Sequence, residues 1–187
     1  MAPRPHDDRA GGEAPLPGAP PAPAAARLVL EPLRLEHAGE LAPLLADPAL
    51  HAFTGGAPDP PDALRARVAR QVAGRSPDGR DVWCNWVLRD GADAVGTVQA
   101  TIRPDRVAEV AWIVFTPFQG RGHARAAAVA LVDWLLAGPA DTVVAHIHPE
   151  HAASAAVARA AGLRPTDERH AGEVRWRRDR GDVPAAP

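Results

Sequence analysis

The sequence contains no lysine and no tyrosine, and its only cysteine is Cys84. All 21 basic residues are therefore arginine. Without lysine no side chain can form a Schiff base, and without tyrosine no phenol can act as a catalytic acid. One cysteine excludes a disulfide within the chain. This composition favours a reducing, cytoplasmic location.

Long apolar runs and an excess of one charge are also missing. No stretch approaches the roughly 18 consecutive apolar residues of a membrane-spanning helix. Met1 to Asp8 has acid and proline where a secretion signal has a basic flank followed by an apolar run. The formal net charge is −2, from 21 basic and 23 acidic residues. We therefore expect neither a membrane nor nucleic acid as a partner.

Length and composition indicate one globular domain between two tails. The 187 residues are 46% hydrophobic and 24% charged, which suits a single packed core. Residues 1–25 hold seven of the 21 prolines and one branched aliphatic residue, Leu16, so we predict a disordered, proline- and alanine-rich tail. We place the domain at residues 26–178 and a flexible C-terminal tail at 179–187.

Apolar spacing and turn residues predict an α/β fold. Turn-length gaps in the middle of the chain predict three strands in an antiparallel meander. Leu64, Val68 and Val72 form the apolar stripe of a helix. In chain order we expect a strand at 27–33, a helix that ends at 47–48, a helix that begins at 59–62, strands at 81–88, 94–102 and 107–115, a helix from 122 to about 137, a strand at 142–147, a helix from 149 to 162 and a strand at 173–177.

The most distinctive segment runs from Gln119 to Ala124, between a predicted strand and a predicted helix. Gly120 and Gly122 let backbone N–H groups converge, and the helix start adds partial positive charge, which suits a diphosphate. Arg121 is placed to add a charge contact. A strand-to-helix turn without any ligand explains the same glycines. A dinucleotide-binding fingerprint needs a third glycine and a nucleoside-triphosphate loop needs lysine, so the sequence excludes both.

Three motifs in order resemble those of the GNAT superfamily of acetyl-CoA-dependent N-acetyltransferases. The segment 119–124 resembles its Gln/Arg-x-x-Gly-x-Gly/Ala motif. Residues 109–114 stand where that superfamily has its central, splayed strand. Residues 149–154, followed by 161–163, resemble its later Pro-Glu-Asn-x-x-Ser and Gly-Phe segments. The resemblance implies a mixed, largely antiparallel central sheet with helices on both faces.

One branch of the superfamily is especially similar. Leu33 to His37 and Leu45 to Pro48 resemble the ribosomal-protein N-terminal acetyltransferases, and all the matches together cover residues 27–177. The superfamily often protonates the departing thiolate with a tyrosine, and that position falls at Ala158 here. The ribosomal-type branch has a serine in the motif, as this chain has Ser154, so the resemblance implies a catalytic role for Ser154.

The resemblance also implies a place for acetyl-CoA. Its pantetheine chain would pair with the backbone of Trp112, Ile113 and Val114. A family asparagine that contacts pantetheine is replaced here by His151. The diphosphate would lie over the backbone of Gln119, Gly120, Arg121, Gly122, His123 and Ala124.

Acetyl transfer requires a group that takes a proton from the attacking amine. Glu109 is the candidate base, directly or through water, because it lies on an otherwise apolar strand where partial burial raises a carboxyl pKa. The alternative is a carboxylate at a strand end, solvated or paired with Arg103 or Arg106. We expect a backbone N–H of the central strand to stabilise the oxyanion.

Three histidines and the cysteine offer other chemistry. His146, His148 and His151 invite a zinc site, but Glu150 is the only nearby fourth ligand of a suitable type, so we expect no metal. A histidine that lines the acceptor tunnel or packs in the protein is the better interpretation. Cys84 has no adjacent base and is expected to be buried on a strand rather than to carry an acyl group.

The predicted activity is acetyl transfer from acetyl-CoA to an amine by direct attack. The acceptor is a protein N-terminus, an aminoglycoside or a small amine, and the protein is a monomer or a homodimer. Two alternatives come from other classes: an acyl-CoA-binding sensor without catalysis, and a nucleotide-binding regulator that uses the glycine turn.

Overall fold

The computed structural model describes residues 28–53 and 56–182. The predicted N-terminal tail, residues 1–25, lies outside these residues. The elements are β1 (Leu28–Pro32), α1 (His37–Leu45), the 3₁₀ helix η1 (Pro48–His51), α2 (Pro61–Val72), β2 (Val82–Asp90), β3 (Asp93–Ile102), β4 (Val107–Val114), the 3₁₀ helix η2 (Thr116–Phe118), α3 (His123–Ala137), β5 (Thr142–Ile147), α4 (Ala152–Ala160), β6 (Arg164–His170) and β7 (Glu173–Asp179).

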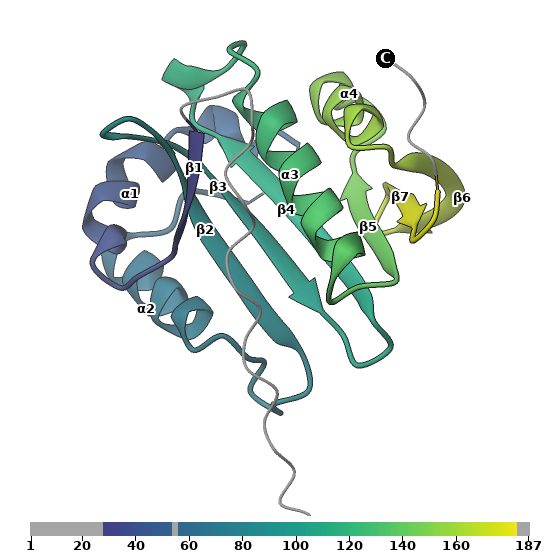
Figure 1. The fold of residues 1–187 in the computed structure, drawn as a ribbon. Helices are drawn as coiled ribbons and strands as arrows, with labels where there is room; N and C mark the ends of the chain where they lie inside the picture. Colours follow the sequence, from purple (N-terminus) through teal and green to yellow (C-terminus); the bar gives the residue numbers. More distant parts are fainter. Residues whose placement is uncertain (1–27, 54–55, 183–187) are drawn as a thin grey trace, which may run out of the picture.

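The strands form one seven-stranded sheet in the order β1-β2-β3-β4-β5-β7-β6 (Figure 1). All neighbours pair antiparallel except β4 and β5, which are parallel. The meander of β2, β3 and β4 is the one that the sequence predicts. The structure thus confirms an α/β fold with a mixed, largely antiparallel sheet.

The parallel pair in the middle of the sheet is short. β3 and β4 share seven register pairs, whereas β4 and β5 share only three, the last of which joins Glu109 to Val144. Beyond that pair the two strands are no longer bonded to each other, although β4 continues to Val114 and β5 to Ile147. This is the splayed central strand that the resemblance implies.

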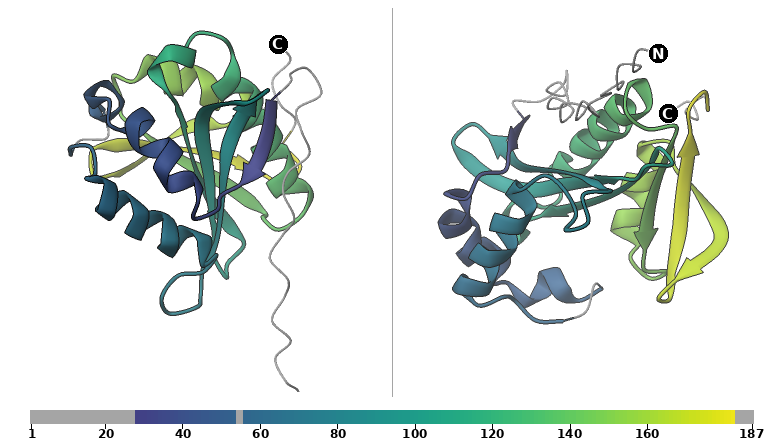
Figure 2. Two further views of the ribbon diagram at one scale, coloured as in Figure 1. Left: turned by 90° about the vertical axis from the view of Figure 1, so that its left-hand side faces the viewer. Right: turned by 90° about the horizontal axis from the view of Figure 1, so that it is seen from below.

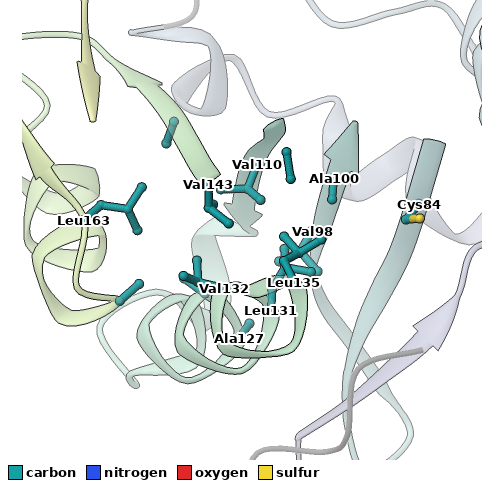
Figure 3. Packing of buried hydrophobic residues seen from close by; sticks show 14 of the residues in the cluster. Cys84, Val98, Ala100, Val110, Ala127, Leu131, Val132, Leu135, Val143 and Leu163 are labelled. Atoms are coloured by element: carbon teal, nitrogen blue, oxygen red, sulfur yellow. The ribbon is translucent and has the colours of Figure 1, made fainter. Parts of the chain in front are cut away.

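Helices cover both faces of the sheet (Figure 2). On one face α3 packs Ala127, Leu131 and Leu135, all without exposed surface, against Val110 of β4 and Val143 of β5 (Figure 3). The α4 helix joins this cluster through Ala158. On the other face, α1 and α2 form a second cluster. Its buried members are Ala38, Leu41, Leu64, Val68, Val87, Ala94 and Phe115. Because α3 touches β4 and β5 together, it holds the sheet where the two strands part.

Two predicted elements differ in detail. α4 begins at Ala152, so Pro149 lies in the turn before the helix rather than in its first turn. The stripe on α2 is shorter than predicted, because Leu64 and Val68 are buried but Val72 is 43% exposed. Within the described residues, no helix has the length and apolar character to cross a membrane.

The C-terminal end of the domain differs more. β6 was not predicted, and nearly all of its residues are exposed. β7 extends to Asp179, and the guanidinium of Arg180 donates to the carbonyl of Ala140 and to the carboxylate of Asp141. The first residues of the tail predicted at 179–187 are therefore bonded to the domain, and residues 183–187 lie outside the described residues.

Candidate active site

A cavity of about 880 Å³ opens where β4 and β5 part. Its walls come from β3, β4, β5, α2, α4, the segment after α1 and the start of α3. Of the twelve predicted site residues, two do not line it, Glu109 and Arg121. The structure brings the other ten together around one space: Trp112, Ile113, Val114, Gln119, Gly120, Gly122, His123, Ala124, His151 and Ser154.

The glycine turn before α3 has room for a ligand. Gly120 and Gly122 have φ angles of 75° and 82°, which glycine adopts without strain. No atom lies within 4 Å of the position that a Cβ would take at either glycine. Among the described residues, the backbone N–H groups of Gly120, Arg121 and Gly122 have no acceptor. The first N–H groups of α3 lack partners in their own helix. The turn therefore fits an anionic group such as a diphosphate.

Arg121 was expected to face the ligand at this turn, but a different arginine, Arg125, lies at the cavity. The side chain of Arg121 bends away from the cavity, donates to the carbonyl of Pro117 at 3.1 Å and lies over the Phe118 ring, 5.5 Å from its centroid. Arg125, one turn into α3, lines the cavity instead. The turn that the motif predicts to bind a diphosphate therefore lies at the cavity, whereas the Arg121 guanidinium does not line it.

One edge of β4 is open toward the cavity. Arg103 N–H bonds to Val107 C=O and Phe115 N–H to Val95 C=O, so the odd-numbered residues of β4 are bonded to β3. Even-numbered residues therefore direct their N–H and C=O groups toward β5. The pair between Glu109 and Val144 still uses the N–H of Val110, because in a parallel ladder the bonds come from the residues on either side of the paired one. Beyond it, the C=O of Val110 and both backbone groups of Trp112 face the opening.

This alternation changes which residues of the central strand are available to a ligand. Ile113 bonds to Thr97 of β3, so its backbone is not available, in contrast to the prediction. The carbonyl of Val114 accepts from the Gln119 side chain at 2.9 Å. The carbonyl of Val110, which the sequence did not single out, is available instead.

Glu109 and His146 meet where the pairing of β4 and β5 ends, since Glu109 is in the last bonded pair and His146 lies two residues beyond its partner Val144. Nδ1 of His146 lies 3.2 Å from Oε1 of Glu109. The Glu109 side chain is 49% exposed, so this carboxylate is less buried than the sequence predicts. His146 is 18% exposed and lines the cavity. Arg103 and Arg106, the alternative partners, bind Asp105 and Asp141 instead.

Two other histidines form an aromatic wall. The Phe53 ring stacks on His151, with centroids 4.2 Å apart, and lies 5.7 Å from the His148 ring. Burial, and to a lesser extent the nearby His148, lower the pKa of His151. Both histidines line the cavity, beside Ser154 of α4. In the described part of the chain, no three His, Cys, Asp or Glu side chains are grouped to hold a metal ion.

Cys84 lies on β2, outside the residues that line the cavity. It is 7% exposed, and burial raises the pKa of its thiol to about 11. A thiol of this kind is a poor nucleophile at neutral pH. The structure thus agrees with a buried strand cysteine.

Several lining residues were missed by sequence reasoning. Arg67 of α2, Gln99 of β3 and Phe53 before α2 face the same space. They belong to no motif and come from separate elements, so only the tertiary packing brings them to the cavity. The position of Gln99 on the face of β3 that carries Thr97 and Thr101 is the only signal that the sequence held.

Comparisons with known proteins agree with this geometry. The sequence model described as "Acetyltransferase (GNAT) domain" matches residues 27–164. No curated protein matches the sequence. Among solved structures, RimL, a ribosomal L7/L12 alpha-N-protein acetyltransferase in complex with coenzyme A, has a TM-score of 0.72 at 18% identity and covers 84% of this chain and 97% of that chain.

Two further solved structures are similar. Spermidine N-acetyltransferase from Vibrio cholerae, in complex with CoA and spermine, has a TM-score of 0.69 at 17% identity, over 82% of this chain and 96% of that one. Aminoglycoside acetyltransferase AAC(6')-Ib, in complex with coenzyme A, has a TM-score of 0.70 at 14% identity, over 82% and 95%. At these identities the structures support the fold, and the family model covers most of the chain. The chain therefore belongs to the GNAT acetyltransferase family, whose reaction is acetyl transfer from acetyl-CoA to an amine.

Proposed function

We propose that acetyl-CoA binds along the open edge of β4, with its pantetheine chain against Val110 and Trp112 and its diphosphate over the turn at residues 119–124. The observation that carries this proposal is the opening itself. Unpaired backbone groups of a central strand lead directly to a turn of unpartnered N–H groups. A chain of amides that ends in a diphosphate complements both parts.

The proposed reaction is a direct attack of the amine on the thioester. The amine nitrogen forms a bond to the carbonyl carbon, the carbon–sulfur bond breaks, and the product is an amide with free CoA. We assign Glu109 to the removal of the amine proton and Ser154 to protonation of the thiolate. Ser154 lines the cavity on α4, and Glu109 lies in the last bonded pair of β4 and β5, where the opening begins.

The charge around the cavity favours an acceptor with one amine. Its charged lining residues are balanced, with Asp59 and Glu173 against Arg67 and Arg125. Five of the eight histidines also face it, and histidine adds only positive charge. A polyamine or an aminoglycoside carries several positive charges and requires an acidic wall. We therefore propose a peptide or protein N-terminus as the acceptor class, which is also the class named for RimL.

A free-thiol assay tests the acceptor. CoA release is measured with acetyl-CoA and a panel of peptides, spermidine and an aminoglycoside. We expect kcat/KM for the best peptide to exceed that for spermidine at least about tenfold, the effect of about 1.4 kcal/mol in transition-state binding. The same peptide with a blocked N-terminus is the control and releases no CoA.

Two outcomes contradict the proposal in different ways. A preference for spermidine or the aminoglycoside contradicts only the acceptor class. Binding of acetyl-CoA without turnover of any amine supports the sensor without catalysis instead. We also propose a cytoplasmic enzyme, a monomer or homodimer, since a single buried thiol suits a reducing compartment.

A further inference from the structure

Glu109 belongs to the last bonded pair of β4 and β5 but does not line the cavity, whereas His146 does. The two side chains are in contact, with His146 Nδ1 3.2 Å from Glu109 Oε1. They project from the same face of the parallel strands β4 and β5, since Glu109 is paired with Val144 and His146 lies two residues beyond Val144, where the strands begin to part. His146 therefore stands between the Glu109 carboxylate and the space that an acceptor enters.

The contact defines which imidazole nitrogen carries the proton. An ionised carboxylate can only accept a hydrogen bond, so Nδ1 of His146 must donate. In a neutral imidazole, Nε2 then keeps its lone pair and can take a proton. The carboxylate holds the ring in this tautomer and stabilises the cation that forms when Nε2 is protonated, as the buried aspartate does in a Ser-His-Asp triad.

We propose that Nε2 of His146 is the atom that accepts the amine proton and that Glu109 is a positioning residue acting through it. This inference rests on the proposed function and deepens the role given there to Glu109. As the amine nitrogen bonds to the thioester carbon, its extra proton passes to Nε2. The carbon–sulfur bond breaks, the thiolate takes a proton from the Ser154 hydroxyl, and that hydroxyl regains one from water. His146 then releases its proton to solvent.

Other groups around His146 are consistent with this role. The His170 ring of β6 lies beside it, with centroids 5.5 Å apart. Arg175 of β7 is opposite His146 in the sheet register, and its guanidinium is paired with Glu168. Among the described residues, Glu109 is thus the only acidic side chain in contact with His146. Its removal leaves the imidazole without the group that selects its tautomer.

The test compares His146→Asn, His146→Ala, Glu109→Gln and the double variant His146→Asn/Glu109→Gln in the full-length protein. The asparagine amide keeps a donor near Nδ1 but has no basic nitrogen, so it separates the structural contact from proton transfer. We expect kcat with the best amine to fall about 10²–10⁴-fold in both His146 variants, the usual effect of losing a general base. Glu109→Gln should lose less, about 10–10²-fold.

Three further readouts separate catalysis from structure. The double variant should be no slower than His146→Asn, because residues that act as a unit are not additive. Added imidazole should restore part of the activity of His146→Ala and none of that of Glu109→Gln. The His146 variants should also recover toward alkaline pH, where more of the acceptor amine is already neutral. The Kd for acetyl-CoA should stay within about threefold of the wild-type value in all variants.

His170→Ala is the matched control, since it removes a histidine that touches His146 but does not line the cavity. The kcat of His170→Ala should stay within about threefold of the wild-type value. If the kcat of the His146 variants also stays within about threefold while that of Glu109→Gln falls 10²-fold or more, the carboxylate itself is the base and this inference is wrong. Activity that falls together with acetyl-CoA binding or thermal stability also overturns it, because the role is then structural. A wild-type protein that turns over no amine overturns the proposed function as well.

Discussion

The first half of the sheet, β1 to β4, differs from its boundary to β5 in how completely the strands are paired. From β1 to β4 every neighbouring pair is bonded over at least five register positions, with nine pairs between β2 and β3 and seven between β3 and β4. The boundary to β5 has three. The first half therefore satisfies its backbone internally, whereas the boundary leaves N–H and C=O groups of β4 open.

The candidate site therefore results from missing hydrogen bonds between two neighbouring strands rather than from an additional element. An unpaired backbone group inside a sheet is costly unless something bonds to it. The open groups of β4 face the cavity, where water or a ligand can bond to them. The α3 helix packs against β4 and β5 at once and keeps the two halves of the sheet in place. Residues that hold β4 and β5 together should therefore affect both the free energy of unfolding and ligand binding, whereas residues packed against the first half should affect only the free energy of unfolding.

The largest expected effect comes from weakening the helix that bridges the halves. Leu131 of α3 is fully buried, so Leu131→Ala should lower the free energy of unfolding by about 2–5 kcal/mol. It should also weaken acetyl-CoA binding, because β4 and β5 are less firmly held. Urea denaturation and a direct Kd measurement check the two effects.

Leu64→Ala in α2 is the matched control. Leu64 is 2% exposed and belongs to the cluster on the other face of the sheet. Its loss should lower the free energy of unfolding about as much as Leu131→Ala does, but leave the Kd for acetyl-CoA within about threefold of the wild-type value. Equal changes in Kd for the two variants would show that α3 has no special role at the opening.

The next effect concerns the glycine turn. At a hundredfold excess over its Kd, acetyl-CoA should stabilise the folded protein by about 2.7 kcal/mol, since it binds only the folded state. Gly122→Val should remove most of this stabilisation, because the side chain fills the open space beside the N–H groups. Thermal melts with and without acetyl-CoA measure it.

Gly79→Val separates the loss of binding from backbone strain. Gly79 has a φ angle of 72°, also has open space around it and does not line the cavity. This variant should melt lower but keep its full acetyl-CoA shift. An undiminished shift in Gly122→Val would exclude the turn as the diphosphate site.

The smallest effect tests how tightly the first half is packed. Burial raises the pKa of the Cys84 thiol to about 11, whereas an exposed cysteine ionises near 9.0. Between these values the unfolded chain releases a proton that the folded protein keeps, so the free energy of unfolding should fall as pH rises, by up to about 1.4 kcal/mol per pH unit. Below pH 9 this contribution is constant.

Cys84→Ala should remove this alkaline slope, as denaturation series at several pH values would show. The sequence makes the measurement clean, because without lysine or tyrosine no other side chain titrates in that range. The same slope in both proteins would mean that the thiol is accessible in the folded state.

The sequence predicted the continuous half well because its strands carry regular signals. The strands from β2 to β4 are apolar or alternating and are separated by short turns, so period and turn residues mark their limits. β6 has no such signal. It is a charged edge strand with nearly every residue exposed, and only its pairing with β7 defines it.

The candidate site was predictable to the extent that it is local in sequence. The turn at 119–124 is contiguous, and its glycines identify it. The contact between Glu109 and His146 joins residues 37 positions apart, so sequence reasoning named both but not their pairing. Arg67 and Gln99 reach the cavity only through packing of α2 and β3, which no local pattern encodes.

The alternation along β4 has a consequence for hydrogen exchange. The amide of Ile113 is bonded to β3, so it should exchange only when the sheet opens. The amide of its neighbour Trp112 faces the cavity and should exchange until a ligand accepts a hydrogen bond from its N–H. Two adjacent amides on one strand therefore report different events, one the unfolding of the domain and the other the occupancy of its site.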